Sequence, residues 1–317
     1  MKRFFAIGLV LMFCFSLFGC SYNFTLHDKK HYTVELIVKG TSADFWKRVN
    51  DGAQAAAAVC DAQVEMSGPL VEENCSDQVT YMQQAIERQP DAIVLAATDY
   101  FLMAQPVQNA IDAGIPVIMV DSDVASDRTV SYVGTDNEEL GRRLAHQVSD
   151  NVKDGGKIGL VSFVQKSYPA VQREVGFRTI MESQNSFEML DTLYCASDTD
   201  QAYELVKELL KREPEMAAVA ALNAQSAEGT ARALSEASSN IPLYTIDCMP
   251  EEAMYMEEGV IKSALLQNPY QMGYFSVITA YKHLNGEEVE SIYTDIYTIT
   301  PDVLFDNIYQ QLIFPFE

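Results

Sequence analysis

The sequence predicts an α/β protein made of two doubly wound parallel sheets. Short, almost wholly apolar runs recur along the chain, and helical stretches of about ten to twenty residues lie between them. Strands that are apolar throughout belong to parallel sheets covered by helices on both faces. There are too many runs for one open sheet, and a chain of 317 residues exceeds what one core usually supports. We therefore expect two domains.

The expected strands are the β-branched apolar runs at 32–38, 92–96, 117–120, 130–133, 158–163, 216–222, 243–246 and 261–266. The clearest helices are expected at 43–60, 201–211 and 226–237, where apolar residues recur on one face. Ser42 is the expected N-cap of the first of these helices. Ala-Gly-Ile-Pro at 113–116 ends a helix and leads directly into the next strand.

The N-terminus predicts export. Lys2 and Arg3 precede an apolar run at 4–18, which is too short to span a bilayer comfortably. Leu17-Phe18-Gly19-Cys20 resembles the lipobox of bacterial lipoproteins, although Phe18 stands where a small residue is usual. We expect a signal peptide at 1–19, lipidation of Cys20 and a polar tether at 20–30. Ordinary secretion with Cys20 incidental is the alternative.

The charge excludes one class of partner. The chain carries 22 basic and 45 acidic residues, a formal net charge of −23. Nucleic acid is not expected to bind, because affinity for phosphate backbones comes largely from Lys and Arg. An anionic membrane surface would also repel this protein, so a lipid anchor followed by a spacer is physically reasonable.

Four cysteines remain after the predicted signal and lipidation site: Cys60, Cys75, Cys195 and Cys248. A Cys60–Cys75 disulfide is compatible with export, but buried free thiols are the favoured interpretation. The wide spacing gives no support for a metal site. We expect neither a metal nor a cofactor.

Polar planar side chains follow several expected strands, where ligands of doubly wound sheets bind. Carboxylates, amides and a guanidinium can satisfy sugar hydroxyls, and aromatic rings can cover the apolar C–H faces. Each residue also has a structural explanation, such as an N-cap for an aspartate or core packing for Phe45, but the combination favours a ligand site. The candidate ligand-binding residues are Phe45, Trp46, Asp121, Arg173, Asn223, Asp247 and Gln267.

The chain resembles the ribose-binding branch of type I periplasmic sugar-binding proteins over nearly its whole mature length. The resemblance rests on the stretches at 44–53, 113–121, 134–137, 173–177, 222–224 and 267–273. It implies that Phe45 and Trp46 stack on the sugar and that Asp121 accepts hydroxyls. Arg173, Asn223, Asp247 and Gln267 would close over the ligand from the second domain and the hinge.

Three departures from the family pattern remove polar groups. Ala43 stands where asparagine is common, Ser122 follows Asp121 where arginine is common, and Ala224 follows Asn223 where an acid is frequent. Ribose itself should therefore not be assumed as the ligand. A deoxy sugar, a different pentose or hexose, or a larger ligand would also fit.

The resemblance also implies the domain organisation. Two Rossmann-like domains would be joined by a three-strand hinge, with crossings near Asp136, Gln267 and Tyr297. The N-terminal domain would comprise 31–136 plus 268–296, and the C-terminal domain 137–267 plus 297–317. Closure of the two domains over the ligand would be a hinge motion driven by contacts made only in the closed state.

The expected function is that of an extracytoplasmic, membrane-tethered binder that delivers a monosaccharide-like ligand to the membrane subunits of an ABC permease. A lipoprotein that presents the ligand to a membrane sensor histidine kinase is the alternative. We expect a monomer held on the outer face of the cell membrane. An enzyme is not expected, because no catalytic motif is present, and a repressor would need a DNA-binding segment where this chain has a signal and a tether.

Overall fold

The computed structural model describes residues 31–72 and 74–314. The predicted signal peptide, the lipidation site Cys20 and the tether lie outside them. Residues from His31 onward form one compact unit that contains two sheets. In the part of the chain described, no helix combines the length and the apolar character needed to cross a membrane.

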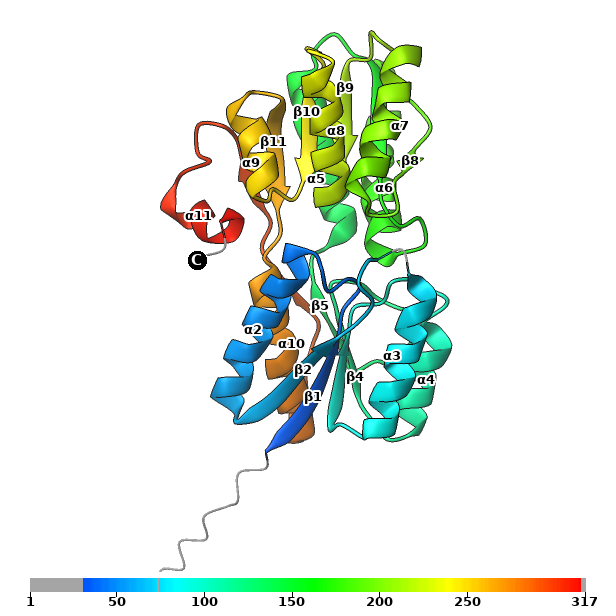
Figure 1. The fold of residues 1–317 in the computed structure, drawn as a ribbon, viewed down its shortest axis with the longest axis vertical. Coiled ribbons are helices and arrows are strands. Elements are labelled where there is room, and N and C mark those ends of the chain that lie inside the picture. Colours follow the sequence, from blue (N-terminus) through cyan, green and yellow to red (C-terminus); the bar gives the residue numbers. More distant parts are fainter. Residues whose placement is uncertain (1–30, 73, 315–317) are drawn as a thin grey trace, which may run out of the picture. The chain divides into compact units, whose positions relative to one another are not determined.

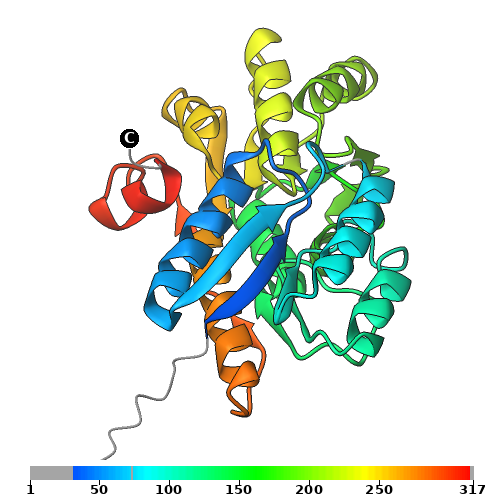
Figure 2. The same ribbon diagram turned by 60° about the horizontal axis from the view of Figure 1, so that its bottom comes forward.

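The first sheet has six parallel strands in the order β12-β5-β4-β3-β1-β2. Helices α2 and α10 cover one face, and α3 and α4 cover the other (Figures 1 and 2). The strands are β1 (Tyr32–Ile37), β2 (Ala62–Ser67), β3 (Ala92–Leu95), β4 (Val117–Val120), β5 (Ser131–Gly134) and β12 (Ile292–Tyr293). The helices are α2 (Asp44–Cys60), α3 (Cys75–Arg88), α4 (Ala104–Asp112) and α10 (Pro269–Leu284).

The second sheet has the order β13-β11-β10-β9-β6-β7, with β8 also paired to β6 and β13 antiparallel to β11. Its strands are β6 (Gly156–Ser162), β7 (Phe187–Met189), β8 (Leu193–Tyr194), β9 (Ala218–Ala221), β10 (Leu243–Ile246), β11 (Ile261–Leu266) and β13 (Tyr297–Ile299). Its helices are α5 (Asn137–Asn151), α6 (Tyr168–Glu182), α7 (Thr199–Arg212), α8 (Ala224–Glu236), α9 (Pro250–Glu257) and α11 (Asn307–Ile313).

We call the elements around the first sheet the first half and those around the second sheet the second half. Their buried apolar side chains form separate clusters: two lie on the faces of the first sheet, and one surrounds the second sheet. The chain passes between the sheets three times, after β5, after β11 and between β12 and β13. Each half therefore has its own hydrophobic core.

Helices α2 and α10 approach each other closely through two glycines. A Cβ on Gly52 would lie 1.9 Å from the Tyr270 carbonyl oxygen, and one on Gly273 would lie 1.8 Å from that of Val49. Glycine is required at both positions, because any side chain would force the backbones apart. This contact joins an early and a late part of the chain into one layer.

The predicted N-cap of α2 is wrong. Helix α2 begins at Asp44, and Ala43 is the N-cap residue, with extended backbone and no capping side chain. The Ser42 hydroxyl instead donates to the Leu70 carbonyl oxygen at 2.7 Å, which ties the β1–α2 loop to the β2–α3 loop. The preference for free thiols is confirmed for Cys60, Cys75, Cys195 and Cys248, although Cys75 is only half-buried.

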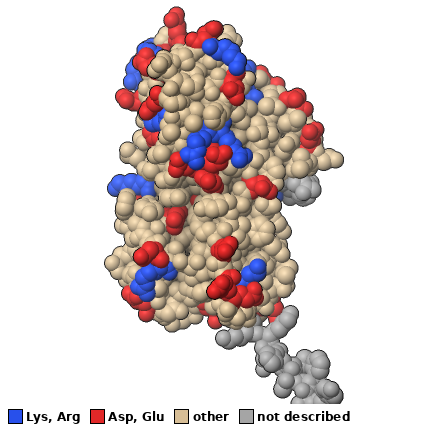
Figure 3. Space-filling model, turned by 180° about the vertical axis from the view of Figure 1, so that it is seen from behind, with Lys and Arg blue, Asp and Glu red and all other residues tan. Residues whose placement is uncertain are grey.

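Acidic and basic side chains are interspersed on the surface. Figure 3 shows one face, on which basic side chains lie beside acidic ones. Exposed pairs among the described residues include Lys47 with Asp44 and Lys211 with Glu208. Exposed pairs of this kind contribute little to stability, so the excess of acid acts mainly on solubility.

Candidate ligand-binding site

All seven candidate residues line one small cavity between the two sheets, of about 40 Å³. The first half contributes Phe45, Trp46 and Asp121, and Gln267 lies where the chain crosses between the halves. The other lining residues are Lys39, Ala43, Glu72, Phe163, Pro169, Ala224 and Gln225. We call the expectation that ligands bind at residues following the strands the strand-end rule. The residues that it selected lie together in the structure, while their contacts with a ligand stay a prediction.

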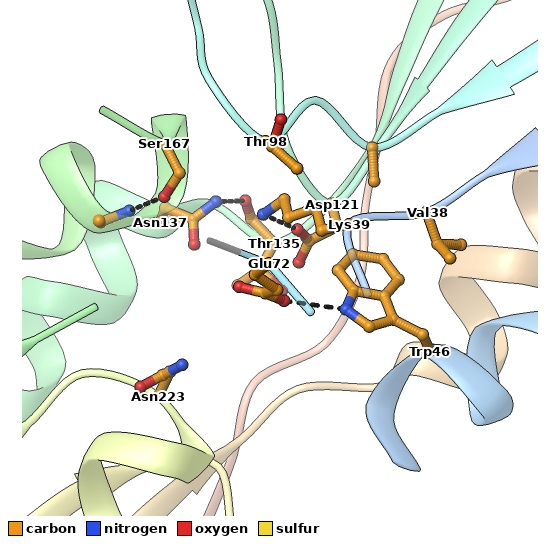
Figure 4. A network of polar contacts seen from close by, with 12 residues as sticks. Val38, Lys39, Trp46, Glu72, Thr98, Asp121, Thr135, Asn137, Ser167 and Asn223 are labelled. Carbon is orange, nitrogen blue, oxygen red and sulfur yellow. Dashed lines mark hydrogen bonds and ion pairs between the residues drawn. The ribbon is translucent and has the colours of Figure 1, made fainter. Parts of the chain in front are cut away.

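Asp121 directly follows β4 and forms a buried ion pair. Lys39 Nζ donates to Asp121 Oδ2 at 2.7 Å, and both side chains are at most 5% exposed (Figure 4). The Asp121 backbone has φ of 60° and donates its N–H to the Val133 carbonyl oxygen. A left-handed backbone is uncommon outside glycine, and such conformations cluster at functional sites.

Asp247 occupies the equivalent place after β10 in the second half. Its φ is 70°, and its N–H donates to the Leu265 carbonyl oxygen of the neighbouring strand. Its partner is neutral, because Gln267 Nε2 donates to Asp247 Oδ1 at 2.8 Å. Burial raises the pKa of Asp247 above its usual value, and the positive charge of Arg173 opposes that rise.

Gln267 uses both ends of its amide within the protein. Its Oε1 accepts a hydrogen bond from the Thr135 hydroxyl at 2.9 Å, while its Nε2 holds Asp247. It therefore joins the end of the first sheet to the end of the second. Its main effect on the cavity is to orient Asp247.

Arg173 is held in place by hydrogen bonds to neutral groups of the protein. It lies on α6 and is 2% exposed. Its Nε donates to Asn137 Oδ1 at 2.8 Å and one terminal nitrogen to the Leu222 carbonyl oxygen at 2.7 Å, with Phe163 beneath the guanidinium at 5.5 Å. Since a guanidinium has five N–H donors, others remain for a ligand.

The aromatic pair forms one wall. Trp46 is 2% exposed, and its ring meets that of the half-buried Phe45 in a T-shaped contact with the ring centroids 5.0 Å apart. Trp46 Nε1 donates to Glu72 Oε1 at 2.9 Å. The other oxygen of Glu72 accepts a hydrogen bond from the Ser197 hydroxyl of the second half at 2.8 Å. Glu72 thus connects the tryptophan to the opposite side of the cavity.

Asn223 is the N-cap residue of α8. Its Oδ1 caps α8 by accepting from the Ser226 N–H, and its Nδ2 donates to Gln225 Oε1 at 2.8 Å and to the Ser197 hydroxyl at 3.3 Å. The residue lines the cavity while both polar atoms are already used inside the protein.

Lys39 and Glu72 are the charged lining residues that sequence reasoning missed. Lys39 follows the apolar run at 32–38 immediately, so the strand-end rule that selected Asp121 applied to it as well. Glu72 lies in the loop after β2, a strand of alternating polar and apolar residues that the search for apolar runs passed over. A period-two pattern was the available signal for β2.

The two halves touch beside the cavity as well. The Tyr100 N–H donates to the Lys166 carbonyl oxygen at 3.0 Å, and the Tyr100 and Tyr168 rings stack with centroids 5.7 Å apart. Together with the bond from Ser197 to Glu72, these contacts connect the halves at two places. The structure therefore has the two halves in contact with each other beside the cavity.

Comparison with known proteins gives a consistent result. Residues 34–288 match the periplasmic binding protein domain family. The ribose import binding protein RbsB of Escherichia coli K12 is 26% identical over 82% of this chain and 88% of its own length. A solute-binding protein from Agrobacterium vitis bound with α-D-tagatopyranose is 30% identical, with a TM-score of 0.85 over 89% of this chain and 99% of that one.

A sugar transporter structure from Clostridium phytofermentans is 34% identical, with a TM-score of 0.79 over 86% of this chain and 99% of that one. The family model covers most of the chain, and the fold agrees with the predicted pair of doubly wound sheets, with β13 as an antiparallel strand of the second. The chain belongs to the periplasmic binding protein family, and the resemblance to type I periplasmic sugar-binding proteins is confirmed.

Proposed function

We propose that this protein captures a neutral, monosaccharide-like ligand in the cavity between its two sheets and delivers it to an ABC permease. The observation that carries the proposal is the meeting of three carboxylates, a guanidinium and an aromatic pair in one cavity. Hydroxyls need such acceptors and donors, and the C–H faces of a sugar need aromatic surface.

The charges around the cavity support a neutral ligand. The cationic side chains are Lys39 and Arg173, and the anionic ones are Asp121, Asp247 and Glu72. These charges nearly balance, so a strongly charged ligand would leave buried charge uncompensated. The names of the relatives, ribose import for one and bound tagatopyranose for another, also support a sugar.

The proposal includes two domains with the boundaries expected from the sequence and a hinge motion between them. The separate cores and the three chain crossings support this division. The bonds from Ser197 to Glu72 and from Tyr100 to Lys166 would break on opening. Small-angle scattering should show a smaller radius of gyration with sugar than without it, and an unchanged radius would contradict closure.

We further propose an extracytoplasmic location with Cys20 lipidated and the protein monomeric. The tether would keep the binder next to its membrane client. Phase separation in Triton X-114 should place the wild type in the detergent phase and the Cys20→Ala variant in the aqueous phase. Presentation of the ligand to a sensor kinase remains the alternative to transport. The relatives named as import proteins favour transport.

Titration calorimetry with D-ribose, D-allose, D-arabinose, D-fucose and D-tagatose tests the binding function. At least one sugar should bind with micromolar or tighter affinity. Trp46, the single tryptophan of the chain, should change its emission on binding, because it lines the cavity and donates to Glu72. Absence of binding across the panel would contradict the proposed function.

A further inference from the structure

We propose that Lys39 contacts the ligand directly and, with Asp121, selects a free hydroxyl at the position that the two side chains touch. This inference rests on the proposed function and names the part of the ligand that this wall of the cavity recognises. It concerns a residue outside the set that the sequence suggested.

Lys39 has unused hydrogen-bonding capacity. An ammonium group has three N–H donors. Among the residues that the structure describes, Asp121 Oδ2 is the one hydrogen-bond acceptor of Lys39 Nζ. The Lys39 side chain is 3% exposed and lines the cavity, with Nζ also 5.6 Å from the centre of the Trp46 ring. Buried donors without acceptors are costly, so an oxygen of the ligand is the fitting partner.

Asp121 supplies a matching hydrogen-bond acceptor beside Lys39. Within the described part of the chain, Asp121 Oδ2 receives Lys39, and no hydrogen bond reaches Oδ1. The ion pair therefore presents N–H donors and a carboxylate acceptor on the same wall (Figure 4). A hydroxyl group can accept from Lys39 and donate to Asp121 at the same time. An O-methylated or deoxygenated ligand cannot do both.

The described residues beside Lys39 on this wall offer the ligand no other cation. Ser122, next to Asp121, is fully buried and does not line the cavity. Ala43 and Ala224 line it without a polar side chain. On the first half's side, Lys39 is therefore the cationic donor available to the ligand among the described lining residues.

The test pairs substitutions in the protein with deletions in the ligand. The sugar from the panel that the wild type binds most tightly is compared with each of its monodeoxy analogues, using wild type and Lys39→Met. We expect one analogue to bind about 10- to 100-fold more weakly than its parent to the wild type, the range for a hydrogen bond to a charged group. The same deletion should cost Lys39→Met about tenfold less than it costs the wild type, because only the hydrogen bond to Asp121 is then lost with the hydroxyl.

Lys39→Met leaves the Asp121 charge buried without its partner and is expected to reduce stability. Asp121→Asn and the double variant Lys39→Met/Asp121→Asn keep the test decisive. If Lys39 touches the ligand, the double variant should bind the parent sugar more weakly than Asp121→Asn alone, by about tenfold or more. Lys157→Met is the matched control, because Lys157 pairs with Glu213 at the surface, away from the cavity.

Equal affinities of Asp121→Asn and the double variant, with every deoxy analogue losing the same factor in wild type and Lys39→Met, would overturn the inference and leave the proposed function intact. If the wild type binds no sugar of the panel, the proposed function fails, and the ligand role of Lys39 fails with it. Circular dichroism and thermal unfolding of each variant confirm that binding is measured on folded protein.

Discussion

Asp121 and Asp247 occupy equivalent positions in the two halves but differ in how their charge is balanced. Each follows a buried strand, has a left-handed backbone and donates its N–H to the neighbouring strand. Asp121 is paired with the ammonium of Lys39, whereas Asp247 is bound by the neutral amide of Gln267. The same backbone position thus holds a carboxylate paired directly with a cation in one half and a carboxylate bound by a neutral amide in the other.

The difference suggests a division of labour. The first half has its ion pair in place before a ligand arrives, so that wall is organised in advance. In the second half, the nearby charge that favours ionisation of Asp247 belongs to Arg173, which is itself supported by neutral groups. We expect the second half to contribute more of the energy that depends on ligand binding.

The largest expected effect is on stability. Asp121→Asn should destabilise the protein by about 3–5 kcal/mol, because it leaves the buried Lys39 ammonium without a counter-charge. Asp247→Asn should cost only about 1 kcal/mol, since Gln267 can still donate to the new amide oxygen. Asparagine tolerates the left-handed backbone in both variants. Urea unfolding of the pair measures the difference, and equal losses would contradict the comparison.

Ligand affinity should depend more on the second half, which contains Asp247, than on the first half, which contains Asp121. Arg173→Ala and Asp247→Ala should each weaken binding of the best sugar by about 100-fold or more, since each removes charged hydrogen bonds to the ligand. The emission change of Trp46 should disappear at sugar concentrations that saturate the wild type. Asp200→Ala, on the surface at 85% exposed, is the control. Retained affinity in both cavity variants would contradict the site.

A second buried carboxyl tests the effect of burial without a cation. Glu252 accepts the Met249 N–H, and burial raises its pKa to about 8. The folded state then holds a proton that the unfolded state has released, so its stability falls as pH rises from about 4.5 towards 8, by about 1.4 kcal/mol per pH unit. Glu252→Gln should remove this slope in thermal or urea unfolding. An unchanged slope would show that Glu252 ionises normally.

The smallest expected effect is the pH dependence of affinity. Because burial raises the pKa of Asp247, lowering the pH should protonate this carboxyl before an ordinary aspartate. Affinity should then fall with decreasing pH, by at most about tenfold per pH unit for one proton. Asp247→Asn should bind more weakly and without this dependence. A pH profile shared by both proteins would assign the titration to another group.

Much of the fold was predictable because strands buried on both faces leave a simple pattern. The runs at 92–96, 117–120, 243–246 and 261–266 correspond to β3, β4, β10 and β11. The short or half-exposed strands β2, β7 and β8 lack continuous apolar runs and were missed. Ser42 failed as an N-cap because α2 begins at Asp44, which leaves Ser42 one residue before the N-cap position, where its hydroxyl donates to the Leu70 carbonyl oxygen.

The part of the site that could be predicted from the sequence consists of residues that directly follow buried strands. Residues after buried strands converge at one edge, so Asp121, Asp247 and Asn223 could be found without coordinates. Which atoms remain for a ligand could not be found that way. The amides of Gln267 and Asn223 are used inside the protein, and the partnership of Lys39 with Asp121 joins two loops that are distant in the sequence.

The glycine contact between α2 and α10 has a consequence for the order in which the chain folds. The core beneath these helices includes Val34 and Ala280, so it cannot close until most of the polypeptide has been synthesised. Contacts between such distant residues form slowly, because a long loop must be closed first. The first half should therefore stay unpacked while the chain is made, a state that suits passage through a secretion channel.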